Sequence, residues 1–201
     1  MKPKLMDDLD ITGFFTWDGE ASFLADTLCI VGPVNILETG FFCGASTFMW
    51  LYLSNASVTS VDPMINLENP NILHNGKPQN VQKLKDAFPN RLTFLQKDSR
   101  LIRPDMSNEK FDLMFIDGDH TESGVRNDFQ LAIDLNIPWV LVDDFNNIVS
   151  HVYQKEFANE LFIVRLYPRK ELFQGNPIPI ALLRRVNHNV INRLSSTSNS
   201  N

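Results

Sequence analysis

The sequence lacks several features that would assign it to a special class of protein. Its two cysteines, Cys29 and Cys43, match neither a zinc-binding spacing nor a disulfide framework. No apolar run approaches the roughly 20 residues that a membrane-spanning helix needs. Residues 1–10 carry charges and contain no apolar stretch like that of a secretory signal. We therefore expect a soluble protein in a reducing, cytoplasmic compartment.

Basic charge is also scarce. The 18 Lys and Arg residues against 24 Asp and Glu residues give a net charge of −6, which argues against a main role in gripping a nucleic-acid backbone. With 201 residues, 43% of them hydrophobic, the chain suits one domain with a buried core. We expect an N-terminal segment at 1–17, the domain at 18–188 and a polar, disordered tail at 189–201. Neither nucleic acid nor a membrane is an expected partner.

Strand-like and helix-like segments alternate along the chain. Short apolar runs predict strands at 34–38, 57–62, 92–96, 111–117, 139–143, 161–166 and 180–186. Apolar residues at helical spacing, or in one long run, predict helices at 44–53, 81–88, 121–133 and 148–159, with another around Leu24. Strands separated by helices form a parallel sheet, but the last two leave no room for a crossover helix and should pair antiparallel. The expected fold is α/β: a Rossmann-like, doubly wound sheet of seven mostly parallel strands, the last one antiparallel between its neighbours, with helices on both faces.

Carboxylates stand at or just beyond the carboxyl ends of the predicted strands. These acids are Glu38, Asp62, Asp98, Asp117, Asp143 and Asp144. Ligands of open α/β sheets bind outside that edge. Because like charges repel when they are gathered at one edge, we expect a cation or hydrogen-bond donors to offset them.

The segment 38–46, ETGFFCGAS, joins the first strand to a buried helix. Gly40 and Gly44 allow a sharp turn and a close approach to a ligand. Asp62 lies 22 residues after Gly40, about where a ribose-binding acid stands in nucleotide-binding βαβ units. Phe42 occupies the middle glycine position of the dinucleotide fingerprint, where its bulk would obstruct a pyrophosphate. The turn therefore favours a nucleoside without phosphate over NAD, and the alternative that its glycines only shape a tight turn stays open.

Four segments resemble the successive motifs of one enzyme family: ETGFFCGAS, VTSVDP, FDLMFIDGDHTESGV and WVLVDDF. They are similar to class I S-adenosylmethionine-dependent methyltransferases, closest to the small-molecule O-methyltransferase group that includes macrocin-type and catechol-type enzymes. The resemblance covers roughly residues 18–186, and the IDGDH block followed by VDDF is its most specific part. It implies S-adenosylmethionine as cofactor, methyl transfer as the activity and a small-molecule acceptor.

The resemblance also implies roles for individual residues. By position, Glu38 and Gly40 hold the methionine end of the cofactor, and Asp62 accepts hydrogen bonds from both ribose hydroxyls. Asp98, with Ser99, receives the adenine amino group. The full set of expected cofactor-binding residues is Glu38, Gly40, Gly44, Ser46, Asp62, Asp98, Ser99 and Asp117.

The expected chemistry is metal-assisted. Asp117, Asp143 and Asp144 match the positions that hold a metal in metal-dependent relatives, so Mg²⁺ or Mn²⁺ is an expected cofactor. Such an ion lowers the pKa of a hydroxyl bound to it. His120 matches the general base of macrocin-type relatives, and with Asp117 it forms the expected catalytic pair. The alternatives are that the aspartates only cap the following helices and that His120 only orients its loop.

Other interpretations stay open. One is a metal-independent N- or carboxyl-methyltransferase, and another is a cofactor-binding homologue without catalysis. Glu122 stands where relatives often carry an aromatic residue, and the resemblance does not identify the acceptor. The proline-rich loop at 63–80 is interpreted either as a lid over the cofactor or as a surface excursion, and a homodimer is compatible with the sequence.

Overall fold

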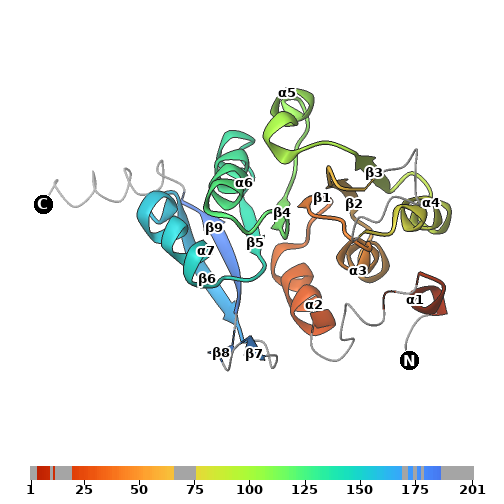
Figure 1. The fold of residues 1–201 in the computed structure, drawn as a ribbon, viewed down its shortest axis with the longest axis horizontal. Coiled ribbons are helices and arrows are strands. Elements are labelled where there is room, and N and C mark those ends of the chain that lie inside the picture. The colour runs from red at the N-terminus through yellow and green to blue at the C-terminus, as the bar shows by residue number, and fades with distance from the viewer. Residues whose placement is uncertain are drawn as a thin grey trace, which may run out of the picture.

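One seven-stranded sheet forms the centre of the computed structural model, which describes residues 4–9, 11, 20–65, 76–168, 172–173, 176–177 and 179–186 (Figure 1). The strand order is β3-β2-β1-β4-β5-β9-β6. The strands are β1 (Asn35–Thr39), β2 (Ser57–Val61), β3 (Leu92–Leu95), β4 (Leu113–Ile116), β5 (Trp139–Val142), β6 (Leu161–Tyr167) and β9 (Ile180–Arg185). Most of the expected N-terminal segment 1–17, the expected tail 189–201 and the part 66–75 of the loop at 63–80 lie outside the described residues.

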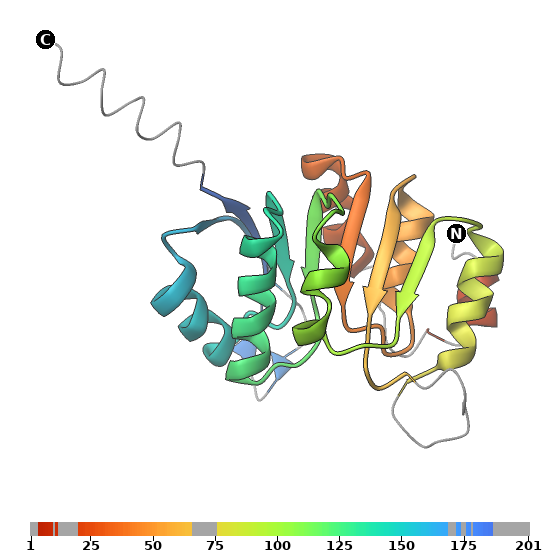
Figure 2. The same cartoon turned by 90° about the horizontal axis from the view of Figure 1, so that it is seen from above.

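The strand directions confirm the predicted topology. Strands β1 to β5 are parallel, and Figure 2 shows β1, β2 and β3 side by side with their arrowheads pointing the same way. Strand β9 pairs antiparallel with both β5 and β6. The link from β6 to β9 also contains a short hairpin that the sequence did not predict, β7 (Leu172–Phe173) with β8 (Asn176–Pro177). The carboxyl ends of the five parallel strands therefore meet at one edge.

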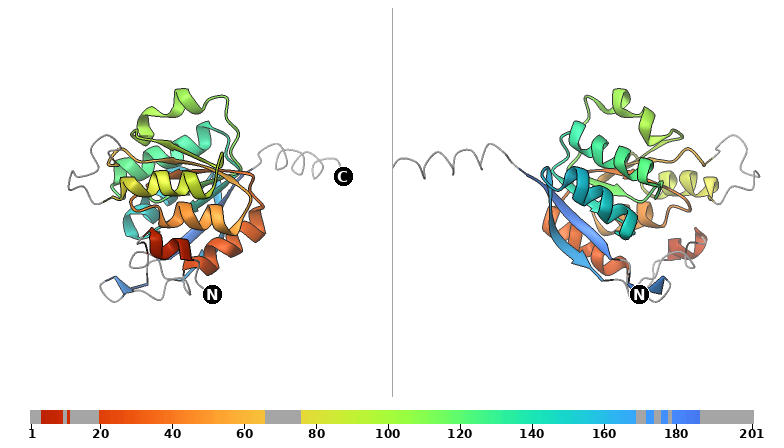
Figure 3. Two further views of the ribbon diagram at one scale, coloured as in Figure 1. Left: turned by 90° about the vertical axis from the view of Figure 1, so that its right-hand side faces the viewer. Right: turned by 60° about the vertical axis from the view of Figure 1, so that its left-hand side comes forward.

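Helices cover both faces of the sheet, as expected for a doubly wound fold (Figure 3). They are α1 (Lys4–Asp8), α2 (Glu20–Val31), α3 (Ala45–Leu53), α4 (Pro78–Ala87), α5 (Arg103–Met106), α6 (Glu122–Asp134) and α7 (Asn147–Val152), with short turns η1 (Ser99–Leu101) and η2 (Tyr153–Phe157). Residues of α2, α3 and α4 share one buried cluster with the sheet. Residues of α5, α6 and α7 share a second cluster on the other face. Within the described ranges, no helix is both long and apolar enough to cross a bilayer.

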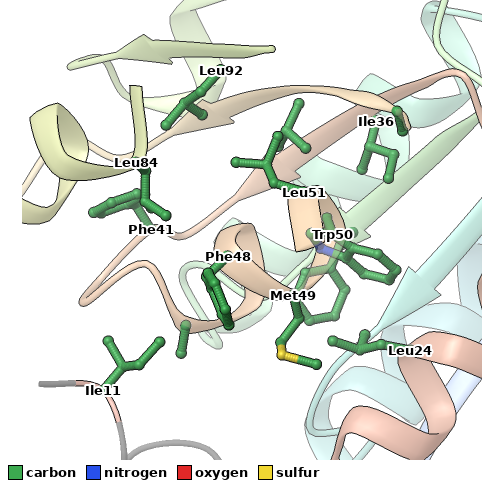
Figure 4. Close-up of a cluster of buried hydrophobic side chains, with 14 of the residues drawn as sticks. Ile11, Leu24, Ile36, Phe41, Phe48, Met49, Trp50, Leu51, Leu84 and Leu92 are labelled. Atoms are coloured by element: carbon green, nitrogen blue, oxygen red, sulfur yellow. The ribbon is translucent and has the colours of Figure 1, made fainter. Parts of the chain in front are cut away.

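Helix α3 is apolar around almost its whole circumference because it is buried on nearly all sides. Phe48, Met49 and Trp50 are each completely inaccessible to solvent. Figure 4 shows Met49 and Trp50 on the side of the helix toward Leu24 of α2, and Phe48 on the side toward Ile11; all five side chains belong to one buried cluster with Ile36 of β1. The helix that follows the glycine turn is thereby packed firmly against the sheet.

Local signals in the sequence set where helices begin. The Thr121 side chain accepts a hydrogen bond from the Gly124 amide at 3.1 Å and is the N-cap of α6. The Asn146 side chain caps α7 in the same way, accepting from the amides of Ile148 and Val149. The helix predicted at 148–159 is α7 followed by the π-helical turn η2.

Arg91 supports the end of α3 that faces away from the candidate site. Its guanidinium donates to the backbone oxygens of Leu51 at 2.9 Å, Ser54 at 2.7 Å and Ala56 at 2.8 Å. Replacing it by leucine leaves these carbonyls without their donor, so we expect Arg91→Leu to lower the free energy of unfolding by about 2–4 kcal/mol. Arg103→Ala, which removes only a surface ion pair, should cost less than about 1 kcal/mol. Urea denaturation measures both, and equal losses would contradict the role of Arg91.

Candidate functional site

A pocket of about 780 Å³ lies at the carboxyl edge of the sheet. Its lining residues lie at the ends of β1 and β2, in the segments that follow β3 and β4, in the segment before α4, and on α6. Six of the predicted site residues line it, and they are Gly40, Asp62, Asp98, Ser99, Asp117 and His120. Glu38, Gly44 and Ser46, which were also predicted to bind the cofactor, do not line it.

The turn after β1 has a left-handed backbone at three positions. The φ angles are +92° at Gly40, +47° at Phe42 and +79° at Gly44. A Cβ atom on Gly40 would lie 2.6 Å from the carbonyl carbon of Asp117 and closer still to its oxygen. The ends of β1 and β4 are therefore in direct backbone contact, which makes this part of the pocket floor a bare main-chain surface.

Asp62 is tied to the backbone of its own protein. One carboxylate oxygen accepts from the amides of Phe41 and Phe42, both at 2.9 Å, and the other accepts from Met64 at 2.8 Å. The residue is only 7% exposed. A carboxylate has about four acceptor positions, so one remains for a ligand in addition to these three bonds. The sequence did not predict this bracing role.

Asp98 is held by a neighbouring arginine. Its Oδ1 atom accepts from the backbone amide of Arg100 at 2.9 Å and from Nε at 2.8 Å, and its Oδ2 atom forms an ion pair with the same guanidinium. These hydrogen bonds lower the pKa of Asp98 below its ordinary value. The carboxylate expected to receive an adenine amino group is thus charged at neutral pH and already paired.

Asp117 and His120 lie together on the pocket wall beyond β4. His120 Nε2 is 3.7 Å from Asp117 Oδ1, and the side chains are 38% and 32% exposed. A neutral imidazole can accept a proton, and a nearby carboxylate stabilises the imidazolium that forms. The loop therefore places a proton acceptor and an anion at one end of the pocket.

Glu38 is fully buried behind this site. Its carboxyl group accepts hydrogen bonds from Thr47 on α3 and from Ser60 on β2, the latter at 2.7 Å. Burial raises the pKa of Glu38 above its ordinary value. The side chain fastens α3 to the sheet, and in this structure it has no surface in the pocket through which to touch a ligand.

The three aspartates predicted to bind a metal are not brought together as a ligand group. Asp117 lines the pocket, but Asp143 and Asp144 do not. Beyond β5 the chain turns toward β9, where the Phe145 amide donates to the Pro179 oxygen at 2.8 Å. Among the described residues, no set of three or more His, Cys, Asp and Glu side chains is placed to hold a metal ion. The donor set of this structure therefore does not fit the predicted ion.

One buried acid of the pocket was missed. Asp128 on α6 is 1% exposed, and its Oδ2 atom accepts from Thr39 Oγ1 at 2.9 Å. Burial raises the pKa of Asp128. The available signal was its spacing, because Asp128 follows Val125 by three residues and precedes Ala132 by four, on the apolar face of the helix. This carboxyl joins α6 to the end of β1 under the pocket.

Comparisons with known proteins agree with this architecture. A family model described as a methyltransferase domain matches residues 37–145, more than half of the chain. No curated protein sequence gives a significant match.

Several solved structures share the fold. The S-adenosylhomocysteine-bound methyltransferase PaMTH1 of Podospora anserina is 15% identical with a TM-score of 0.63, over 92% of this chain and 89% of that one. The O-methyltransferase of Bacillus cereus, in complex with S-adenosylhomocysteine, is 16% identical with a TM-score of 0.67, over 92% of each chain. The S-adenosylmethionine-bound O-methyltransferase TomG of Streptomyces achromogenes is 12% identical with a TM-score of 0.66, over 93% of this chain and 92% of that one. At these identities the likeness establishes the fold alone.

Proposed function

This chain belongs to the methyltransferase domain family and is an S-adenosylmethionine-dependent methyltransferase, and from that premise we propose that it methylates a hydroxyl group of a small molecule. The observation that carries the proposal is the Asp117–His120 pair, with its 3.7 Å separation, on the wall of the same pocket as the glycine turn. Deprotonation of a hydroxyl is the step for which an acceptor oxygen needs a base.

The proposed cofactor position follows the pocket wall. The one remaining acceptor position of Asp62 serves a single ribose hydroxyl, where the resemblance implied both, and Asp98 with Ser99 borders the adenine. The bare backbone at Gly40 allows the methionine end to lie close to the sheet. Bound there, S-adenosylmethionine supplies an electrophilic methyl group on a sulfonium sulfur.

The residues of this chain supply the acid–base part of the reaction. Bound S-adenosylmethionine would supply the methyl group to the acceptor oxygen, and the electron pair of its carbon–sulfur bond would remain on sulfur. The hydroxyl proton passes to the His120 imidazole, and Asp117 stabilises the positive charge that develops on the ring. The carboxylates of the described residues do not form a site for a metal ion, and the proposed proton transfer uses His120 and Asp117 alone.

Chelation separates this proposal from the metal-assisted alternative. We expect calorimetry to show that one S-adenosylhomocysteine binds per chain. We also expect that EDTA does not change the rate at which S-adenosylhomocysteine forms from S-adenosylmethionine in the presence of small hydroxylated acceptors. Activity that disappears with EDTA and returns with Mg²⁺ would favour the metal-assisted reaction. Absence of cofactor binding would contradict the proposed function as a whole.

A further inference from the structure

The loop 117–121, which carries His120, is held at both of its ends. At its start, the Asp117 amide donates to the Thr39 carbonyl at the end of β1, at 3.0 Å. At its other end, the loop packs tightly against the first turn of α6, where a Cβ atom on Gly124 would lie 2.5 Å from the backbone oxygen of Asp119. The position of His120 therefore depends on how β1 and α6 are placed relative to each other.

Asp128 joins β1 and α6 directly. Its Oδ2 atom accepts at 2.9 Å from the hydroxyl of Thr39, the same residue whose carbonyl holds the Asp117 amide. A Cβ atom on Gly118 would lie 3.6 Å from this Oδ2 atom and 3.6 Å from the Thr39 Cβ atom, so the loop backbone lies against the hydrogen bond. Strand β1, the loop 117–121 and α6 thus form a closed cycle of contacts, and the Asp128–Thr39 bond closes it.

The same carboxylate is connected to the segment that follows β3. Asn127 Nδ2 donates to the Asp128 Oδ1 atom at 3.1 Å and to Ser99 Oγ at 3.2 Å. Ser99 lines the pocket on the side proposed for the adenine. Because Asp128 is only 1% exposed, water has little access to compete for these bonds. One buried side chain thus connects the cofactor side of the pocket with the loop of the base.

We propose that Asp128 is a positioning residue of the methyl transfer, which acts through Thr39 to hold the His120 imidazole against the acceptor hydroxyl beside the bound cofactor. The proposal rests on the proposed function, in which His120 is the base. Asp128 itself exchanges no proton with the substrate. Since a base works only within hydrogen-bond reach of the proton that it removes, a small displacement of the loop is costly.

Thr39→Val tests the proposal, because it removes the hydroxyl donor with little change of shape and leaves Asp128 in place. With an acceptor that the wild-type enzyme methylates, we expect turnover to fall about tenfold or more. Calorimetry should show an affinity for S-adenosylhomocysteine within about threefold of wild type. Asp128→Leu removes the acceptor of the same hydrogen bond, and as a second variant it should lower turnover at least as much.

Combination with His120→Ala shows whether the effect passes through the base. When the imidazole is absent, its placement no longer matters, so Thr39→Val should change the residual turnover by less than about threefold. A merely structural role would lower turnover by the same factor in both backgrounds.

Thr47→Val is the matched control. The Thr47 hydroxyl also donates to a buried carboxylate, that of Glu38, but Thr47 lies on α3 and does not line the pocket. Both threonines are almost completely buried, at 2% exposed for Thr39 and 0% for Thr47. Thr47→Val should therefore keep the turnover of wild type, and urea denaturation shows whether the two variants lose similar stability.

Hydrogen exchange gives a readout that needs no acceptor. If the Asp128–Thr39 bond closes the cycle of contacts, its loss lets the loop open locally. The amides of Asp117 and Thr121, which donate to the Thr39 carbonyl and the Asp119 carboxylate, should then exchange about tenfold faster in Thr39→Val. The same amides should keep their protection in Thr47→Val.

The possible results are distinct. The inference is overturned by wild-type turnover in folded Thr39→Val, by an equal loss in both backgrounds, by a loss of cofactor affinity in place of turnover, or by unchanged exchange of the loop amides. In each of these cases a low turnover of His120→Ala leaves the proposed function standing. If His120→Ala has wild-type turnover, or S-adenosylhomocysteine does not bind, the proposed function fails and the inference fails with it.

Discussion

Gly40→Ala is expected to destabilise the domain by more than about 4 kcal/mol, or to prevent folding altogether. The new Cβ would lie 2.6 Å from the Asp117 carbonyl carbon. The position of Cβ is fixed by the backbone of residue 40 and the Asp117 atoms that it meets are backbone atoms, so no side-chain rotation relieves the overlap. The ends of β1 and β4, which are adjacent paired strands, would have to separate. The φ angle of +92° adds strain for any residue with a side chain.

Gly32→Ala separates these two contributions. Gly32 also has a positive φ, +59°, but a Cβ there would meet nothing within 4 Å. We expect this control to lose only about 1 kcal/mol. Urea denaturation and size-exclusion chromatography compare the two variants, and S-adenosylhomocysteine calorimetry tests whether any folded Gly40→Ala protein keeps its pocket. Equal midpoints for the two variants would contradict the close approach of β1 and β4.

The order of strands and helices is predictable because each element has a distinct local pattern. The strands β4 and β5 are four residues long and nearly all buried, so they appear in the sequence as short apolar runs. The antiparallel β9 follows from the absence of a crossover helix after β6. The hairpin β7–β8 was missed because its two-residue strands are too short to produce a pattern.

The location of the pocket is predictable for a topological reason. Parallel strands place their carboxyl ends at one edge, so Asp62, Asp98 and Asp117 meet there although they are far apart in the chain. The strand order does not determine which hydrogen-bond partners each carboxylate has. Two of the three amides on Asp62 depend on the exact path of the glycine turn, and the third belongs to Met64, two residues after Asp62. The Arg100 partner of Asp98 depends on the turn η1.

The structure places two sets of predicted site residues outside the pocket, Glu38 and the pair Asp143 and Asp144. A residue at the end of a strand faces either the pocket or the core, and one residue of register decides between them. Glu38 faces the core, where two hydroxyl groups hold it. The Asp143 amide still donates to the Ile116 oxygen at the end of β4 at 2.9 Å, yet among the described residues Asp117, Asp143 and Asp144 do not form a group that could hold a metal ion. Pattern arguments identify the edge of the sheet, but not the direction in which each side chain leaves it.

The placement of His120 makes it the group whose removal should affect catalysis most. It lies on the pocket wall, three residues after Asp117 in the loop that follows β4, and it directly precedes Thr121, the N-cap of α6. The N-cap fixes the loop, because Thr121 is held by its bond to Gly124 and its amide donates to Asp119 at 2.9 Å. A ring on a fixed loop can be presented to an acceptor hydroxyl without a large loss of conformational entropy.

His120→Ala should therefore lower turnover about 10²–10⁴-fold with any acceptor that the wild-type enzyme methylates, since this is the usual contribution of a positioned base. The affinity for S-adenosylhomocysteine should stay within about twofold, because the lost imidazole serves the acceptor and not the adenosine. His151→Ala is the matched control, since His151 lies on α7 and does not line the pocket, and its turnover should equal that of wild type. Steady-state kinetics gives turnover, and calorimetry gives the affinity. A folded His120→Ala enzyme with wild-type turnover would show that the proton leaves by another route, and a parallel loss of cofactor affinity would reassign His120 to cofactor binding.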